Sequence, residues 1–194
     1  MLISLPYDRQ RAVEYARRWA LSRNPLFPDF AGVGGDCTNF VSQCILAGCS
    51  ITNDTPTFGW YYRSEADRAP AWSGVDELYR FLTGAEDFRA ENGGVGPYAT
   101  DAARSGQIMA GDVIQLSDAR GEFYHTLIIS DITDDEIYVC AHTNDVLDRP
   151  LSTYRYGGLR VLHIEGANLF YDRTPAFTDL QNATAIRTLR TVID

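Results

Sequence analysis

The chain has 194 residues, of which 45% are hydrophobic and 22% are charged, and these proportions are ordinary for a globular domain and exclude intrinsic disorder. Seventeen basic residues against 26 acidic ones give a net charge of −9, which disfavours nucleic acid and anionic membranes as partners because both select a basic surface. The length predicts a single domain over 1–194, with a core at about 7–165 and a C-terminal extension at 166–194.

The N-terminal part of the chain has helical periodicity. Residues 8–23 carry one apolar stripe, with Asp8 as a capping residue and Asn24-Pro25 as the end signal. A second helix is predicted from Cys37, with Asp36 as its N-cap and Gly48 as its C-cap glycine. This placement puts the cysteine at a helix start.

The middle of the chain, 50–110, has no regular pattern apart from a helical candidate at 74–83 and a glycine-rich stretch at 93–97, so we interpret it as a long excursion that shapes a site. After residue 111 the apolar period becomes two, and strands are predicted at 113–116, 124–131, 136–144 and 159–164. Helices come first and antiparallel strands later, which indicates an α+β fold. The tail after 166 is expected to wrap the surface.

The sequence contains three histidines, and two of them lie on consecutive predicted strands. Strand alternation groups His125 with Leu127 and Ile129, and His142 with Cys140 and Asn144. We expect His125 and His142 to be cross-strand neighbours. If the helix of Cys37 packs on that face, a thiol, an imidazole and a polar orienting group converge, which is the arrangement that a cysteine nucleophile needs.

The run Gly-Gly-Asp-Cys-Thr-Asn-Phe-Val-Ser-Gln at 34–43 resembles the signature of the putative amidase domain family, which is similar to the NlpC and CHAP cysteine peptidases with a papain-like core. Further stretches match the same family, and the resemblance covers about 7–165; these stretches are 7–16, 24–25, 59–60, 111–115, 124–126 and 141–145. The resemblance implies a compact papain-like fold in which the nucleophile-bearing helix packs on an antiparallel sheet.

The resemblance also implies a function and a set of site residues. Cys37 is the expected nucleophile and His125 the general base. The third member is expected to be His142, as in NlpC-type enzymes, with Asn144 as the alternative, as in CHAP-type enzymes. The implied activity is hydrolysis of an amide or peptide bond. A murein-type peptide of the bacterial cell wall is the first substrate to consider, and a cytoplasmic amide is the second.

Three residues near these motifs are candidates for substrate binding, namely Asp36, Trp60 and Tyr124, although Trp60 equally suits core packing. The expected partner is a peptide or amide substrate, with no cofactor and no metal. Nothing in the sequence indicates an oligomeric state. The chain start lacks a signal-peptide pattern. We therefore expect a cytoplasmic protein if the chain is complete, and a secreted or cell-wall-associated one if it is a trimmed fragment.

Two alternatives remain open from the residues alone. One is a binding module that keeps the fold without the reaction. The other is a zinc site formed by Cys37, His125, Cys140 and His142, a ligand set that suits zinc. The four cysteines are expected to be free thiols, with Cys37 the only strongly reactive one and its Sγ within about 4 Å of an imidazole nitrogen of His125.

Overall fold

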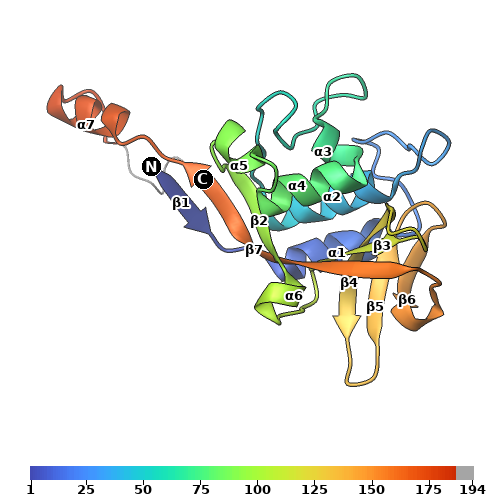
Figure 1. The fold of residues 1–194 in the computed structure, drawn as a ribbon. Helices are drawn as coiled ribbons and strands as arrows, with labels where there is room; N and C mark the ends of the chain where they lie inside the picture. The colour runs from blue at the N-terminus through green and yellow to red at the C-terminus, as the bar shows by residue number, and fades with distance from the viewer. Residues whose placement is uncertain (187–194) are drawn as a thin grey trace.

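A computed structural model describes residues 1–186 and shows an α+β fold, as predicted. The strands within this range form a seven-stranded antiparallel sheet, and Figure 1 shows the longer helices gathered on one side of it. The strands are β1 (Leu2–Leu5), β2 (Gly96–Asp101), β3 (Val113–Ser117), β4 (Phe123–Ile132), β5 (Ile137–Ala141), β6 (Val146–Pro150) and β7 (Gly158–Phe170). The helices are α1 (Arg9–Trp19), α2 (Cys37–Cys49), α3 (Pro70–Ser73), α4 (Val75–Thr83), α5 (Phe88–Glu91), α6 (Ala102–Ser105), η1 (Leu151–Thr153) and α7 (Thr174–Gln181).

The sheet has the order β1-β7-β3-β4-β5-β6, and β2 pairs with β7 off this path. The 13-residue strand β7 joins the two parts, because its first half pairs with β3 and its second half pairs with β1 and β2. The hairpins β3–β4, β4–β5 and β5–β6 then follow in sequence. Successive hairpins bring residues near 125, 143 and 154 toward one region, which becomes important for the site.

Alternation along the strands produces two apolar clusters, one on each face of the sheet. Ile128 and Cys140 pair across β4 and β5 and pack with Val41, Cys44 and other residues of α2. On the other face, Leu127, Ile129, Val139 and Ala141 form a cluster with β3, η1 and α6. Helix α2 therefore covers the face of Ile128, whereas the sequence-based expectation placed it over the face of His125, Leu127 and Ile129.

The predicted helix ends need two corrections. Helix α1 ends at Trp19 rather than near residue 23, although Asp8 caps its start by accepting a hydrogen bond from the backbone N–H of Arg11 at 3.0 Å. Helix α2 continues through Gly48, and Ser50 takes the left-handed conformation (φ 55°) that ends it. Gly48 has a packing role instead, because a Cβ atom there would lie 2.2 Å from Cε2 of the Tyr7 ring.

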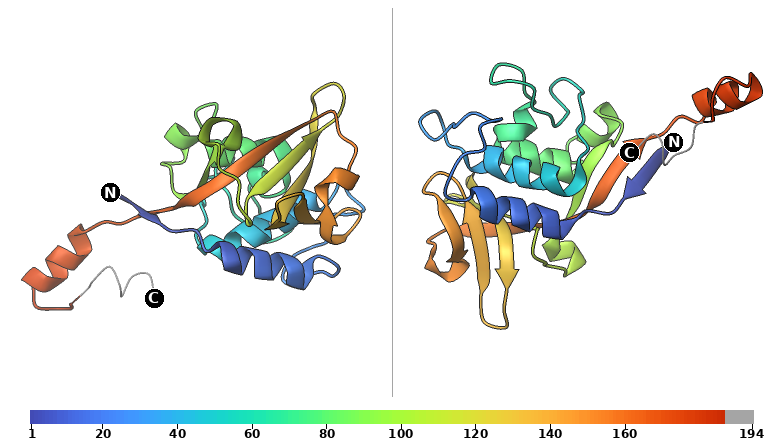
Figure 2. Two further views of the ribbon diagram at one scale, coloured as in Figure 1. Left: turned by 90° about the horizontal axis from the view of Figure 1, so that it is seen from below. Right: turned by 180° about the vertical axis from the view of Figure 1, so that it is seen from behind.

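Strands β1, β2 and β6 were missed by the sequence-based prediction, and the final strand is longer than predicted. The glycine-rich stretch at 93–97 leads into β2 rather than remaining a loop. The expectation that the tail wraps the surface is wrong for its described part. The outer half of β7 and helix α7 run away from the body (Figure 1), both views in Figure 2 show α7 clear of the other elements, and no residue of α7 is buried. Residues 187–194 lie outside the described range.

Within residues 1–186, the helices are too short and too polar to cross a lipid bilayer.

Candidate active site

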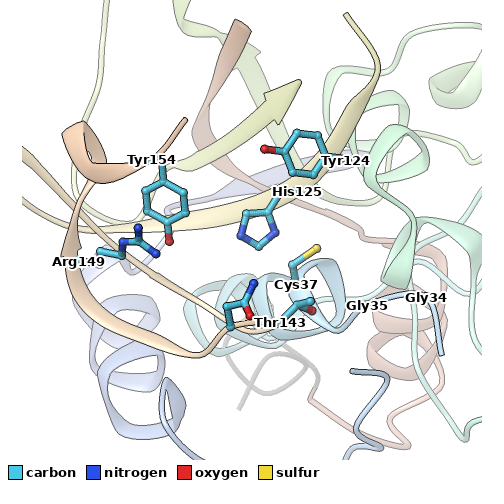
Figure 3. A pocket seen from close by; sticks show the side chains of 9 residues that line it. Gly34, Gly35, Cys37, Tyr124, His125, Thr143, Arg149 and Tyr154 are labelled. Atoms are coloured by element: carbon cyan, nitrogen blue, oxygen red, sulfur yellow. The ribbon is translucent and has the colours of Figure 1, made fainter. Parts of the chain in front are cut away.

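A cavity of about 350 Å³ opens where the start of α2 meets β4 and the loops on either side of β6. Figure 3 shows that Cys37 and His125 face the same hollow, together with Tyr124, Arg149 and Tyr154. Its walls are formed by Gly34, Gly35, Cys37, Tyr124, His125, Thr143, Asn144, Arg149 and Tyr154. The structure thus brings the two main sequence candidates, Cys37 and His125, to one cavity.

Cys37 is the first residue of α2, and buried polar contacts fix this helix in place. Ten of its 13 residues are buried, so its polar side chains need internal partners. The Thr38 hydroxyl lies 2.9 Å from that of Thr126 on β4. Ser42 accepts a hydrogen bond from the indole N–H of Trp60 at 3.0 Å. These bonds lock the rotation of α2 and thereby the position of the thiol at its start.

Asp36 precedes the nucleophile candidate, but its side chain does not cap the helix. The carboxylate is fully buried and accepts hydrogen bonds from the side chain of Asn39 (2.8 Å) and the backbone N–H of Phe30 (3.1 Å), and it contacts His142. The first N–H groups of a helix have no intrahelical acceptor. Because Asp36 turns away from them, the N–H groups beside Cys37 remain free to bind an anionic oxygen atom.

The position of His142 differs from the expectation that it orients His125. Its Nδ1 lies 2.6 Å from Oδ2 of Asp36, and its Nε2 lies 2.9 Å from the carbonyl oxygen of Trp19. The ring is 1% exposed and stacks on Phe40 with centroids 3.9 Å apart. A carbonyl oxygen only accepts, so Nε2 donates to it. Both nitrogens are therefore engaged inside the protein, and neither is free for His125.

His125 reaches the cavity from β4 near the point where that strand begins. The pKa of this imidazole is lowered to about 4, mainly by burial and secondly by the positive charge of Arg149. The ring is therefore neutral at pH 7 and able to accept a proton. The hydrogen-bond contact of Cys37 Sγ in this structure is with the hydroxyl of Thr38 at 3.9 Å. Cys37 and His125 line the same cavity, and the separation of about 4 Å between the thiol and the imidazole stays a prediction.

Asn144, the alternative third member, lies on a tight turn between β5 and β6 that borders the cavity. Both Thr143 and Asn144 have positive φ, 62° and 72°, and this conformation is unfavourable for a β-branched residue such as threonine. The Thr143 hydroxyl compensates by accepting a hydrogen bond of 2.7 Å from the backbone N–H of Asp36. The turn is thus fastened to the residue before Cys37, with Asn144 on the cavity wall.

The three expected substrate-binding residues lie in different environments in the structure. Tyr124 lines the cavity and is half exposed. Trp60 is fully buried between Trp72 and Phe81, with ring centroids 5.0 and 6.0 Å away. Asp36 is also fully buried. Trp60 and Asp36 support α2 and its first turn, and neither lies where a substrate in this cavity would touch it.

The other cysteines have properties that differ from those of a nucleophile. All four thiols are free. Burial raises the pKa of Cys44 and of Cys140, and it raises the pKa of Cys49 to about 11. These three thiols therefore stay protonated and unreactive at neutral pH.

The proposed zinc ligands do not come together. Residues 1–186 contain no group of three or more histidine, cysteine or acidic side chains arranged to hold a metal ion. The reason is the sheet: Cys140 pairs with Ile128 and faces α2, whereas His125 is an odd number of residues from Ile128 and projects to the opposite face. His142 is held by Asp36 and Trp19.

Sequence reasoning missed three cavity residues, Thr143, Arg149 and Tyr154. Thr143 lay inside a family-matching stretch, so its neighbour Asn144 could have drawn attention to it. Arg149 lies in β6 and Tyr154 directly follows η1, and neither element has a clear apolar alternation in the sequence. Their position beside Cys37 depends on the turn at 142–145 that folds β6 back along β5.

Comparisons with known proteins agree with the motif-based resemblance. The profile of the putative amidase domain family matches residues 6–164. One relative is the uncharacterized protein YhbB of Bacillus subtilis (strain 168), which is 30% identical over 126 residues; the match covers 63% of this chain and 37% of that protein. No solved structure matches significantly. Because the family profile spans most of the chain and includes Cys37 and His125, this protein belongs to the putative amidase domain family.

Proposed function

We propose that this protein is a cysteine-dependent amidase or peptidase in which Cys37 is the nucleophile and His125 the general base. The observation that carries the proposal is the shared cavity: a thiol at a helix start and a neutral imidazole line one opening. Membership of an amidase family supports hydrolysis of an amide bond as the reaction.

The reaction follows from these two side chains. His125 accepts the proton of the Cys37 thiol as Sγ attacks the carbonyl carbon of the substrate. The N–H groups at the start of α2 bind the negatively charged oxygen of the tetrahedral intermediate. The C–N bond then breaks, and His125 gives its proton to the leaving amine. Water, deprotonated by His125, hydrolyses the thioester and restores the thiol.

We propose Asn144, rather than His142, as the group that orients His125. Support comes from the cavity wall, which includes Asn144, and from the hydrogen bonds that hold both nitrogens of His142 elsewhere. An amide oxygen accepts an N–H bond and so selects the imidazole tautomer whose other nitrogen accepts a proton. A small rotation of the imidazole and the thiol side chains then completes the set, as often occurs on substrate binding.

The test uses murein-type peptides, which the family resemblance makes the first substrates to try. The wild-type protein is compared with Cys37→Ala, His125→Ala and the matched control Cys49→Ser, with products identified by mass spectrometry. Hydrolysis that is lost by more than about 10³-fold in the first two variants and kept in the third supports the proposal. Turnover that survives Cys37→Ala contradicts it. Binding of peptides with no hydrolysis by the wild type favours the alternative of a non-catalytic binding module.

A further inference from the structure

In the part of the chain that the structure describes, Arg149 is the one permanently charged side chain that lines the cavity beside Cys37. The other wall residues are glycines, hydroxyl and amide side chains, Cys37 and the neutral imidazole of His125. Among residues 1–186, no acidic side chain lines this cavity, although acidic residues outnumber basic ones by 26 to 17 in the chain. The local charge of the cavity is therefore opposite to that of the protein as a whole.

Arg149 is held rigidly by its neighbours. Its Nε donates to the hydroxyl of Thr153 at 2.8 Å, and its Nη2 donates to the backbone carbonyl of Thr153 at 3.2 Å. The guanidinium carbon lies 4.2 Å from the centre of the Tyr154 ring. The Thr153 hydroxyl donates in turn to the carbonyl of Pro150 at 2.7 Å. The side chain is thus fixed before any ligand arrives, which reduces the entropy lost on binding.

The guanidinium has no acidic partner among residues 1–186, where the ion pairs involve other arginines. By contrast, the partly buried Arg9, Arg23 and Arg160 each contact an aspartate. A guanidinium has five N–H donors; two donate to Thr153 and one takes part in a side-chain hydrogen bond with Tyr154, which leaves two for a ligand. Two parallel N–H groups match the two oxygens of a carboxylate.

We propose that Arg149 recognises a carboxylate of the substrate, so that the preferred substrates are amides or peptides with a carboxylate close to the bond that is cut. This inference rests on the proposed function of Cys37. The carboxylate belongs either to the C-terminal residue of a short peptide or to an acidic side chain next to the scissile bond. Both present the same group to the same guanidinium.

A bound carboxylate has a second effect, on His125. The charge of Arg149 disfavours the protonated form of this imidazole. Burial, the larger cause of the low pKa of His125, remains; a carboxylate that neutralises Arg149 removes the second cause, so the pKa rises and the imidazole becomes a stronger base. Recognition of an anionic substrate and activation of the base are therefore coupled.

The experiment uses two alkylating reagents of nearly equal shape, iodoacetate, which carries a carboxylate, and iodoacetamide, which is neutral. The alkylation rate of Cys37 in the full chain is measured with each by peptide mapping, and their ratio is compared with that for glutathione. The ratio is used because both reagents attack the same thiolate, so a change in thiolate population cancels. We expect iodoacetate to be favoured in the wild type relative to glutathione.

Three variants carry the test. We expect Arg149→Gln to lower the iodoacetate-to-iodoacetamide ratio by about tenfold, in line with loss of one charge-assisted hydrogen-bond pair, and Arg149→Lys to give an intermediate ratio because it keeps the charge and loses the fork. Arg104→Gln on α6 removes the same charge away from this cavity and should keep the wild-type ratio. If Arg149→Gln does not fold, the iodoacetate-to-iodoacetamide ratio of Arg149→Lys tests the proposal: a ratio below that of the wild type supports it, and an equal ratio contradicts it.

A second arm identifies the source of the carboxylate. An acetylated dialanine peptide with a free C-terminal carboxylate and its C-terminal amide are compared as protectants of Cys37 against iodoacetamide, alongside acetyl-glutamate amide and acetyl-glutamine amide. Protection by the free-acid peptide alone indicates a terminal carboxylate, and protection by acetyl-glutamate amide alone indicates an acidic side chain. Each pattern supports carboxylate recognition, whereas equal protection by acids and their amides contradicts it.

The two possible failures give different results. If Cys37 reacts with both reagents and the ratio is the same in the wild type and in Arg149→Gln, carboxylate recognition is overturned while the proposed nucleophile stands. If Cys37 reacts with neither reagent, the proposed function fails, and the role of Arg149 that rests on it fails too.

Discussion

The neutral state of His125 is the feature of the site that can be measured without a substrate. Burial and Arg149 both disfavour its protonated form and lower its pKa to about 4. In a nuclear magnetic resonance titration of histidine-labelled protein, we expect the His125 signal to titrate near pH 4. In Arg149→Gln the midpoint should move upward, because the repulsion between two positive charges is removed.

The same pKa predicts a dependence of stability on pH. An unfolded chain binds a proton at His125 below about pH 6.5, whereas the folded chain does so only near pH 4. The contribution of this residue to stability is therefore complete above pH 6.5 and is lost as the pH falls to 4. The free energy of unfolding, measured with urea at several pH values, should fall more steeply between about pH 6.5 and pH 4 in the wild type than in His125→Gln. Equal slopes, or a titration of His125 near pH 6.5, would contradict the inferred neutral state.

His142 and Asn144 should differ in what their replacement damages. In His142→Ala the buried carboxylate of Asp36 loses its 2.6 Å partner but keeps Arg23 at 3.2 Å, so the cost should stay below the figure of about 3–5 kcal/mol for a buried charge left without any partner. Asn144→Gly removes an exposed amide and keeps the backbone freedom that φ of 72° requires, so stability should change by less than about 1 kcal/mol.

Urea unfolding and peptide hydrolysis, measured at equal folded fraction, separate the two roles. We expect His142→Ala to be destabilised and Asn144→Gly to be the less active variant. A stable His142→Ala protein with strongly reduced turnover would restore His142 as the orienting residue and place the site closer to the NlpC pattern.

At the scale of elements, apolar periodicity correctly predicted the helices and strands that bury one face. It predicted α1, α2, α4, β3, β4, β5 and β7 because each has a regular stripe or alternation that packs on the core. Strands β1, β2 and β6 pair mainly at the sheet margin, where burial imposes no clear pattern. The motif around Cys37 predicted the thiol at a helix start.

The arrangement of the site beyond Cys37 and His125 could not be read from spacing. Alternation grouped the residues of β4 correctly, but the predicted strand at 136–144 ends at Ala141, so His142 and Asn144 lie in the following turn and not on one strand face. Alternation also did not show which face α2 covers. That choice placed His142 beneath α1, against the carbonyl of Trp19, and left Asn144 at the cavity. Arg149 arrives through the register of β6 on β5, which depends on a turn with two left-handed residues that no pattern of hydrophobicity encodes.

Gly48 shows how tertiary packing overrides helix propensity. Alanine is about 1 kcal/mol better than glycine inside a helix, so propensity alone predicts that Gly48→Ala stabilises α2. A Cβ there would lie 2.2 Å from the Tyr7 ring and 2.9 Å from the carbonyl oxygen of Asp8, and the Tyr7 hydroxyl is bonded to Gly111. We expect Gly48→Ala to lower the free energy of unfolding by about 2 kcal/mol.

The matched control for this prediction is Gly32→Ala, because a Cβ at Gly32 meets no atom within 4 Å. Its unfolding midpoint should stay close to that of the wild type. A Gly48→Ala protein that is more stable than the wild type would show that Tyr7 can move away and that helix propensity prevails.

At the scale of the whole molecule, the fold divides into a body that contains the cavity and an arm that projects from it. The body includes both apolar clusters and all cavity residues. The arm consists of β1, the outer half of β7 and α7 (Figure 2), and it exposes large apolar side chains, among them Phe170, Phe177 and Leu180 at 62–65%. The arm is connected to the body through β7 and through the short segment that leads from β1 into α1.

This division predicts that α7 can be removed without loss of the site. No residue of α7 is buried, so a chain that ends at Asp172 loses little buried apolar area from the described residues. It keeps the full length of β7 and the hydrogen bonds between Met1 and Tyr171. We expect its unfolding midpoint in urea and its rate of Cys37 alkylation to equal those of the full chain. The m-value should also change little, because it scales with the surface exposed on unfolding.

The control is a chain that ends at Gly166. This truncation removes residues of β7 that pair with β1 and β2, so the shortened chain should unfold at a lower urea concentration. Equal destabilisation by both truncations would mean that α7 packs on the body in solution.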